Sequence, residues 1–435
     1  MLFQSQVPAL MNQIGIKVYN ATTQARKVEA AKRLNFYHDS QLERLSEQLD
    51  QLFSDPSSMV QVSLNIVKKV INNLSMVYSQ PPTRTLDGPE KDQKLYAEIL
   101  EQCAFDVKMK QAQRYTKLLK TILIRPVWRN DKIDLDLITG NLADVKCGDS
   151  PEILEAVLIT NYGTSEKPED ITYSFWTEDV WKKLDYRGNA IESQPNPYEI
   201  LPFIPLFDYS PPSSAFWLPG GEDLISQQEA INLKLTDLLH LLSTQSFGVG
   251  YIKGSEGGGT LKVDPGSLVQ LGENGEIGFE AQQARIEEVV NAIDKLIKWG
   301  CISHGLSAAS MSTDPQEASG LSKIVDNREL AEIRQDDIAL FRSYEMQIFE
   351  VLRVVWNTHS TQKLSEQATL SIDFADPRQK VSATEQAQAD DLKIAQGVLS
   401  PVDVIMRDNP DLESREDALA ALLKIKEENK LLLTD

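Results

Sequence analysis

The sequence predicts an α+β protein that is mainly helical, with a β-rich layer and a small separate β module. Apolar residues recur at helical spacing over several long segments, alternate with polar residues in a central region, and give way to a glycine-rich stretch at residues 246–280. With 41% apolar and 25% charged residues among 435, the chain has the composition of a soluble globular protein with two or three compact regions.

Three helices are expected in the N-terminal part of the chain. The helical patterns cover residues 25–53, 60–78 and 90–122. The second pattern ends at Ser79-Gln80-Pro81-Pro82, because proline cannot continue a helix.

A β-rich layer is expected next. The stretch ILIRPVWRNDKIDLDLIT (122–139) alternates around Asn130-Asp131, which predicts a hairpin. Further strands are expected at residues 153–162, 172–177 and 180–186. Core packing explains the aromatic residues of this region better than a base-stacking surface does. They are Trp176, Trp181, Phe203, Phe207, Tyr209, Phe216 and Trp217.

The next segment predicts a stalk with a tip. One helix is expected over residues 222–245 and a second over 285–301, with short strands in the glycine-rich stretch between them. The passage SAASMSTDPQEASGLSKIVDN (307–327), made of small and polar residues, then precedes a helix over 320–356, about 55 Å long. A strand at 369–374 and a helical region at 382–433, broken at Ser400-Pro401 and Asn409-Pro410, complete the chain.

No catalytic site, metal site or cofactor is predicted. Three widely spaced cysteines and four histidines offer no metal-binding motif, and no phosphate-binding loop occurs. Asp134 and Asp136 share one strand face, as metal ligands can, but a solvated face is the simpler interpretation. The formal charge of -20 argues against a protein that grips nucleic acid tightly. Neither a signal peptide nor a membrane span is expected, so we expect a cytosolic protein.

The order of these parts resembles the portal proteins of tailed bacteriophages over nearly all of the chain after about residue 60. The first passage that carries the resemblance is NIVKKVINNLSMVYSQPP (65–82). The second is GGEDLISQQEAINLKLTDLL (220–239), followed by GVGYIKGSEGGGTLKVDPGSLVQL (248–271). The third is ASGLSKIVDNRELAEIRQDDIALFRSYEMQIFEVL (318–352), which looks like the family's Ser-Gly entry into a long helix.

The resemblance implies a portal fold with long stem and wing helices, a β-rich wing layer and a small β clip. The implied parts are an N-terminal helical segment (1–60), the wing (61–221), stem helix 1 (222–245), the clip (246–283), stem helix 2 (284–305), the tunnel loop (306–320), the long wing helix with its returning strand (321–376) and a short helical crown (377–435).

The resemblance also implies a structural role and not an enzymatic one. Such proteins form a ring, commonly of twelve copies, at one capsid vertex, through which double-stranded DNA is packaged and ejected. The implied partners are the terminase large subunit, a tail adaptor, and the major capsid or scaffolding protein, with DNA passing through without tight binding. The implied location is the virion, after assembly in the host cytoplasm, with no membrane contact.

Three groups of residues are implied to act in this role. The DNA-facing tunnel loop would contain Ser307, Ser310, Met311, Ser312, Thr313, Asp314, Gln316, Glu317 and Ser319. The channel wall of the stem would contain Glu222, Asp223, Glu229, Lys234 and Asp237. The docking surface of the clip for terminase and adaptor would contain Tyr251, Lys253, Glu256, Lys262, Glu273, Asn274 and Glu276.

The charge of the chain fits a channel through which DNA slides. Twelve copies at -20 each carry about -240, and residues 222–245 contain four acids and one lysine. Two alternatives remain open. One is a non-portal oligomeric scaffold or adaptor with the same stalk and tip, and the other is a metal-dependent DNA-modifying enzyme that uses Asp134 and Asp136.

Overall fold

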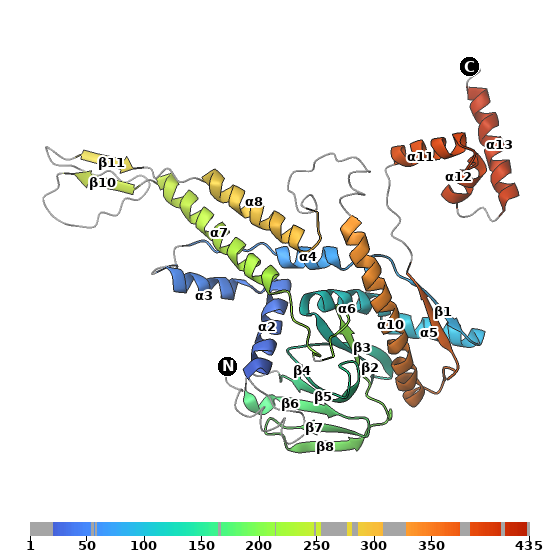
Figure 1. Ribbon diagram of the computed structural model, residues 1–435, viewed down its shortest axis with the longest axis horizontal. Helices are drawn as coiled ribbons and strands as arrows, with labels where there is room; N and C mark the ends of the chain where they lie inside the picture. The colour runs from blue at the N-terminus through green and yellow to red at the C-terminus, as the bar shows by residue number, and fades with distance from the viewer. Residues whose placement is uncertain are drawn as a thin grey trace. The chain divides into compact units, whose positions relative to one another are not determined.

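A computed structural model describes residues 21–53, 56, 59–163, 167–213, 215–247, 249–253, 276–280, 286–307, 328–374, 383–409 and 414–432. The chain divides into two compact units, of which the first comprises Met1–Thr313 with Glu329–Ala375 and the second Asp314–Arg328 with Asp376–Asp435. Helices and strands both occur, so the predicted α+β class is confirmed (Figure 1).

Two helices replace the single one predicted over residues 25–53. They are α2 (Ala21–Tyr37) and α3 (Leu42–Leu52). Asp39, between them, has a φ of 65°, a left-handed conformation that a continuous helix cannot contain. The prediction was wrong because the apolar spacing continues across this one residue.

The helix predicted over residues 60–78 is also shorter than expected. Helix α4 (Ile66–Leu74) is followed by a 3₁₀ turn, η2 (Val77–Ser79), and residues 60–65 are not helical. The Asn65 side chain accepts a hydrogen bond from the Lys68 backbone N–H at 2.9 Å, which fixes Asn65 as the N-cap.

The helix predicted over residues 90–122 is two helices, α5 (Glu90–Gln102) and α6 (Phe105–Leu119). Ala104 separates them with a φ of 48°, and Lys120 ends α6 with a φ of 69°. Both residues are in the left-handed region, where the backbone leaves the helix. The chain therefore enters its first long strand at Thr121.

Two antiparallel sheets form the β-rich layer. The three-stranded sheet has the order β3-β2-β9, with β2 (Thr121–Arg129), β3 (Lys132–Thr139) and β9 (Ile204–Phe207). Asn130 and Asp131 have φ values of 54° and 57°, as the tight turn of the predicted hairpin requires. The second sheet runs in chain order through β4 (Ala143–Cys147), β5 (Leu154–Asn161), β6 (Thr172–Trp176), β7 (Val180–Leu184) and β8 (Ala190–Pro195).

Strands β4, β8 and β9 were not predicted, whereas β5, β6 and β7 correspond to the three predicted strands. Core packing is confirmed for Phe203, Phe207 and Phe216, which are buried in one cluster. Tyr209, in contrast, is exposed.

The long helix α10 (Arg328–His359) supplies one side of the main core. Its predicted apolar stripe is confirmed, because Ile338, Phe341, Tyr344, Ile348, Leu352 and Val355 are all buried. Strand β12 (Thr369–Asp373) follows and pairs antiparallel with β1 (Thr83–Asp87), a strand that was not predicted. The predicted start of the long helix, residues 320–327, lies outside the described residues.

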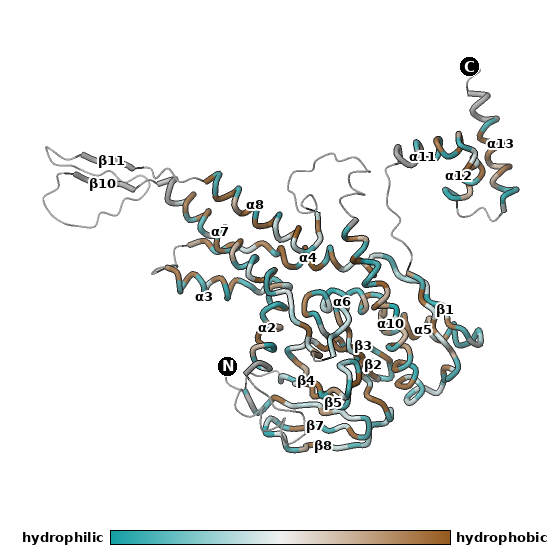
Figure 2. Tube along the Cα trace, viewed as in Figure 1, coloured by the Kyte–Doolittle hydropathy of each residue, from teal (hydrophilic) through white to brown (hydrophobic). Residues whose placement is uncertain are grey.

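The predicted helix, β module and second helix are confirmed. Helix α7 (Glu222–Phe247) leads to strand β10 (Val249–Lys253), which pairs antiparallel with β11 (Glu276–Glu280), and α8 (Ile286–Ser303) returns beside α7 (Figure 1). Polar and apolar residues alternate along both helices (Figure 2), as expected where each helix packs on one face.

The second unit contains α11 (Ala383–Ala395), α12 (Pro401–Asp408) and α13 (Arg415–Leu432). The predicted break at Ser400-Pro401 is confirmed. Ser400 and Asp403 form a capping box, and Pro401 occupies the first turn of α12. Arg407 joins α12 to α11 through two hydrogen bonds to Asp390, of 3.0 and 2.7 Å.

Candidate functional site

The stalk is a pair of helices that pack closely through one glycine. The Gln227 side chain of α7 donates a 2.6 Å hydrogen bond to the Leu296 carbonyl of α8. A Cβ atom on Gly300 would lie 2.0 Å from the Gln227 side-chain oxygen. The Gln227 amide can therefore lie between the two helices only because position 300 is a glycine, which has no side chain.

We expect Gly300→Ala to be coupled energetically to Gln227. Alanine normally stabilises a helix by about 1 kcal/mol relative to glycine. Here the new methyl group displaces the Gln227 amide and breaks its hydrogen bond, so the variant should lose that gain. In the Gln227→Ala background the gain should return. A double-mutant cycle by urea denaturation should thus give a coupling of about 1 kcal/mol or more, and additive values would contradict the packing described.

A buried amide joins the stalk to helix α4. The Gln228 side-chain oxygen accepts hydrogen bonds from the backbone N–H groups of Ile66 (2.8 Å) and Val67 (3.2 Å). Its side-chain nitrogen donates to the Leu64 carbonyl (2.6 Å) and to Asn232 (2.9 Å). The first N–H groups of a helix have no partner within that helix. Gln228 therefore satisfies, from α7, two donors that α4 cannot satisfy itself.

Ion pairs join the stalk to the N-terminal helices. The Glu229 carboxylate of α7 lies 2.9 Å from Lys32 Nζ of α2 and 3.1 Å from Arg44 Nε of α3. Its side chain is only 14% exposed. Together with Gln228, this residue places α2, α3 and α4 on the same side of α7.

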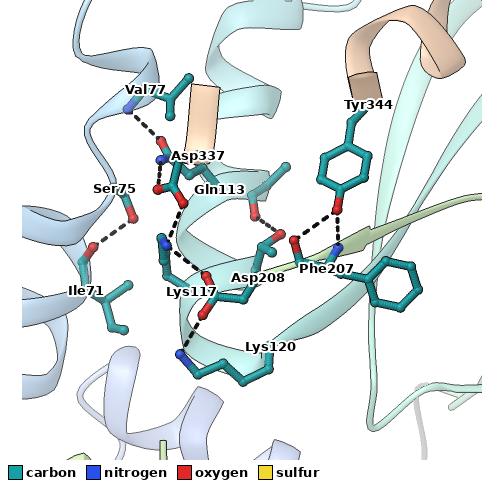
Figure 3. A network of polar contacts seen from close by, with 12 residues as sticks. Ile71, Ser75, Val77, Gln113, Lys117, Lys120, Phe207, Asp208, Asp337 and Tyr344 are labelled. Carbon is teal, nitrogen blue, oxygen red and sulfur yellow. Dashed lines mark hydrogen bonds and ion pairs between the residues drawn. The ribbon is translucent and has the colours of Figure 1, made fainter. Parts of the chain in front are cut away.

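A group of four charges, of which Lys117 and Asp337 are buried, links α6 to the long helix α10. Lys117 Nζ lies 2.8 Å from Asp337 Oδ1 and 2.9 Å from Asp208 Oδ1, and Lys120 Nζ lies 2.8 Å from Asp208 Oδ2 (Figure 3). Nearby, the Tyr344 hydroxyl accepts from the Phe207 N–H and donates to the Phe207 carbonyl, both at 3.1 Å. Helix α10 is thus bound to the body by specific polar contacts as well as by its apolar stripe.

The environment shifts the protonation of this group. Burial raises the pKa of Asp337 to about 6, and the contact with Lys117 only partly offsets the effect. Burial opposes the charge of Lys117, but Asp208 and Asp337 outweigh it and raise the pKa of Lys117. The lysine therefore stays charged at neutral pH, while Asp337 gains a proton on mild acidification.

We expect the effect of Asp337→Asn on the free energy of unfolding to depend on pH. A carboxyl group whose pKa is raised from 3.8 to about 6 on folding binds protons better when folded. Its stabilising contribution is present below pH 3.8 and is lost as the pH rises through about 6. The variant lacks this carboxyl group. The free energy of unfolding of the wild type, relative to that of the variant, should therefore rise as the pH falls from 7 to 5. Urea denaturation at several pH values measures it, and a difference that shrinks on acidification would refute the assignment.

A second buried cluster lies eight residues further along α10. Glu345 accepts hydrogen bonds from Tyr78 (2.6 Å) and from Arg84 Nε (2.6 Å) and Nη2 (2.9 Å). The Glu345 side chain is fully buried and that of Arg84 is 6% exposed. Burial, with the nearby carboxylate, raises the pKa of Tyr78 well above its usual value. The tyrosine therefore remains a neutral donor.

The stem residues named from the resemblance do not share one environment. Glu222 and Asp223 are exposed at the start of α7, where the helix dipole favours acids. Asp223 lies 3.4 Å from His304, whose pKa burial lowers. Lys234 pairs with Asp237 at 2.8 Å along the helix. Glu229 differs from all of these, because it is half-buried against α2 and α3.

Most of the other named residues lie outside the described part of the chain. Of the residues named for the tunnel loop only Ser307 is described, four residues after the end of α8. In the clip, Tyr251 and Lys253 lie on β10 and Glu276 lies on β11. Tyr251 is opposite Gly278, and Lys253 is opposite Glu276. The roles of both groups remain predictions.

The carboxylates proposed for the alternative metal site are paired with cations. Asp136 lies 2.7 Å from Arg125 and 3.0 Å from Arg129, and Asp134 lies 3.3 Å from Lys108. A metal ion would have to displace these partners. Among the described residues there is no group of three or more potential metal ligands, nor any helix with the length and apolarity to cross a bilayer.

Sequence reasoning missed Gln228, Asp337 and Glu345, although a signal was present. Each is a polar residue at helical spacing from buried apolar positions. Gln228 lies four positions after Leu224 and three before Ile231. Glu345 has the same relation to Phe341 and Ile348. A polar residue within an apolar stripe indicates a buried hydrogen-bond network.

Comparison with known proteins gives weak structural likenesses and no relatives by sequence. No family model matches this chain, and no curated protein does. A chain in the virion of a native gene transfer agent particle is 10% identical, with 78% of this chain and 88% of that chain covered and a TM-score of 0.40. A chain in the neck of the native particle, solved with C12 symmetry, is 12% identical over the same shares, with a TM-score of 0.43. At these sequence identities and TM-scores, the likeness assigns neither a fold nor a function to this chain.

Proposed function

We propose that this protein is the portal subunit of a tailed-phage-type particle. In this role it forms a ring at one capsid vertex, through which double-stranded DNA is packaged and later ejected. The observation that carries the proposal is the stalk: two packed helices joined by an antiparallel β pair, in the order that the sequence resemblance requires. The long helix α10 then returns to an α+β body, as the wing helix of that family does.

The parts of the chain acquire roles in this proposal. Residues 222–245 and 284–305 form the stem, residues 246–283 the clip that meets the terminase large subunit and then the tail adaptor, and residues 306–320 the tunnel loop. Residues 377–435 form the crown, on the capsid side with the major capsid or scaffolding protein. The subunit is structural and needs no cofactor.

Charge supports a channel that does not retain DNA. Each phosphate bound by a lysine or arginine adds affinity that translocation would have to break. Glu222 and Asp223 are exposed at one end of α7, and the only lysine of residues 222–245 is paired with Asp237. Residues 222–245, the first stem helix, thus offer a duplex little positive charge.

Electron microscopy of the purified protein tests the assembly. We expect rotationally symmetric rings, of twelve or a neighbouring number of copies, with a channel wide enough for a DNA duplex. A stable monomer at high concentration, or an oligomer without a channel, would refute the portal role. An oligomer without a channel would instead support the scaffold or adaptor alternative. Magnesium-dependent DNA cleavage that is lost in Asp136→Ala would support the enzyme alternative.

We expect deletion of residues 310–317 to leave ring assembly intact and to impair DNA packaging or retention. Apart from Met311 these residues are small or polar, and they contain no lysine or arginine, so they can line a pore without holding phosphate. A packaging assay with terminase and empty capsids measures DNA protected from nuclease. A Gly/Ser segment of equal length serves as the matched control for chain connectivity. Failure of the deleted protein to form rings would show that the segment is structural.

A further inference from the structure

A cavity of about 370 Å³ is lined by residues of β2 and of the neighbouring strands β6, β7 and β8. Its size is within the range of ligand pockets, about 300–1,000 Å³. Trp176 and Trp181 are directly opposite each other on β6 and β7, so they share one face of the sheet. The Trp176 indole is nearly parallel to the Tyr198 ring, with 6.4 Å between the centroids and 11° between the planes. Most of the wall is made of aromatic side chains and proline rings, among them Trp128, Trp176, Trp181, Pro195, Pro197 and Tyr198.

Two hydrogen-bond donors of the lining residues have no acceptor. They are Trp176 Nε1 and Arg125 Nε, both buried and without a hydrogen-bond partner in the part of the chain that the structure describes. The Arg125 guanidinium lies 5.8 Å from the centroid of the Trp176 ring, so the two donors belong to neighbouring side chains. A buried donor without an acceptor costs about 1–3 kcal/mol. A ligand that supplies acceptors to this cavity is therefore favoured.

The unmet hydrogen bonds of this cavity are all of one kind. Among its lining residues, all of which are described, no buried side-chain acceptor lacks a partner. The cavity also offers an anion little free charge, because Arg125 pairs with Asp136 and Arg129 pairs with Asp134 and Asp136. The ligand that fits is therefore apolar, uncharged and rich in acceptors.

A proline-rich segment has these properties. Proline has a carbonyl acceptor but no N–H, so consecutive prolines bring no donor that would need a partner. In the polyproline II conformation the backbone forms no internal hydrogen bonds, and its carbonyls remain free. Such segments bind in grooves lined by aromatic side chains.

We propose that this cavity, which we name the aromatic pocket, binds a proline-rich segment of a partner protein in the polyproline II conformation. Proline rings of the segment pack against Trp128 and Trp181, and its carbonyls accept hydrogen bonds from Trp176 Nε1 and Arg125 Nε. Both donor atoms are covered in the unbound protein, so the side chains around them move aside as the segment enters. The inference goes beyond the proposed function, because no residue of the pocket belongs to the stem, the clip or the tunnel loop.

Fluorescence anisotropy of a labelled oligoproline peptide, titrated with the purified protein, tests the proposal. We expect saturable binding, whereas Gly-Ser and Gly-Asp peptides of equal length should not bind. Trp176→Phe keeps an aromatic ring but removes the indole N–H, so it should weaken binding about 5–10-fold, as the loss of one hydrogen bond predicts. Trp181→Ala removes a wall of the pocket and should weaken binding about 10-fold or more.

The matched control is Trp299→Phe, the same substitution at a tryptophan that is 62% exposed on α8. It should bind the peptide as the wild type does, and circular dichroism checks that all variants are folded. The proposal is wrong if the oligoproline peptide does not bind, or if the wild type and both pocket variants bind it equally well. Tighter binding of the Gly-Asp peptide would also overturn it, because the site would then recognise charge. Binding by a protein that forms no rings would support the pocket and refute only the portal role.

Discussion

Glu345→Ala should destabilise the first unit by about 3–5 kcal/mol, the largest effect that we expect of a single substitution. The change removes one carboxylate that is hydrogen-bonded to both Arg84 and Tyr78. Arg84 would retain only Asp106, at 2.8 Å, whose own side chain is 45% exposed. The buried guanidinium would thus lose most of its compensation, and the Tyr78 hydroxyl would lose its acceptor.

Urea denaturation of the purified protein measures this effect. The matched control is Glu350→Ala on the same helix, where the carboxylate is 54% exposed and pairs with Arg353. An exposed pair contributes at most about 1 kcal/mol, so the control should remain close to wild type. Equal effects of the two substitutions would show that the Glu345 cluster is not buried as described.

Gln228→Leu should cost about 2–4 kcal/mol and should loosen the connection between stalk and body. Leucine has a similar volume but cannot accept hydrogen bonds from Ile66 and Val67 or donate one to Leu64. The buried Val67 N–H would be left without its acceptor, and the Ile66 N–H would keep only the Leu64 carbonyl, at 3.0 Å. We therefore expect faster amide hydrogen exchange at the first turn of α4 than the global loss of stability explains.

The matched control for Gln228→Leu is Ser226→Ala on the same helix. Ser226 is exposed, and its hydroxyl bonds only to the Asp223 carbonyl one turn earlier. The control should change neither the stability nor the exchange at α4. If Gln228→Leu leaves the exchange of Ile66 and Val67 at the wild-type rate, Gln228 does not cap the helix.

Features that depend on local periodicity could be predicted from the sequence. The buried stripe of α10, the Asn130-Asp131 hairpin and the order of stalk and tip all follow from spacing within a few turns or residues. The helix breaks at Asp39 and Ala104 could not be predicted, because one left-handed residue leaves the apolar spacing almost unchanged. Strand β1 was missed for another reason, since its partner β12 lies nearly 300 residues away.

The candidate site was predictable only in outline. Composition and order indicate a stalk with acidic residues, but they do not distinguish exposed Asp223 from Glu229, which is held by Lys32 and Arg44. That distinction depends on which helices pack against α7. The same limit applies to Gln228, whose partners at residues 64–67 lie more than 160 positions away.

The two charged clusters on α10 also determine how this helix can move. Asp337 and Glu345 are eight residues apart, about 12 Å along the axis, and each has its own cationic partner on the body. Sliding α10 by one turn, about 5.4 Å, would separate both carboxylates from those partners at once, whereas an apolar stripe alone would tolerate the slip. A force along the axis at the Arg328 end of α10 would therefore be transmitted to the body, because the two clusters prevent the helix from sliding against it.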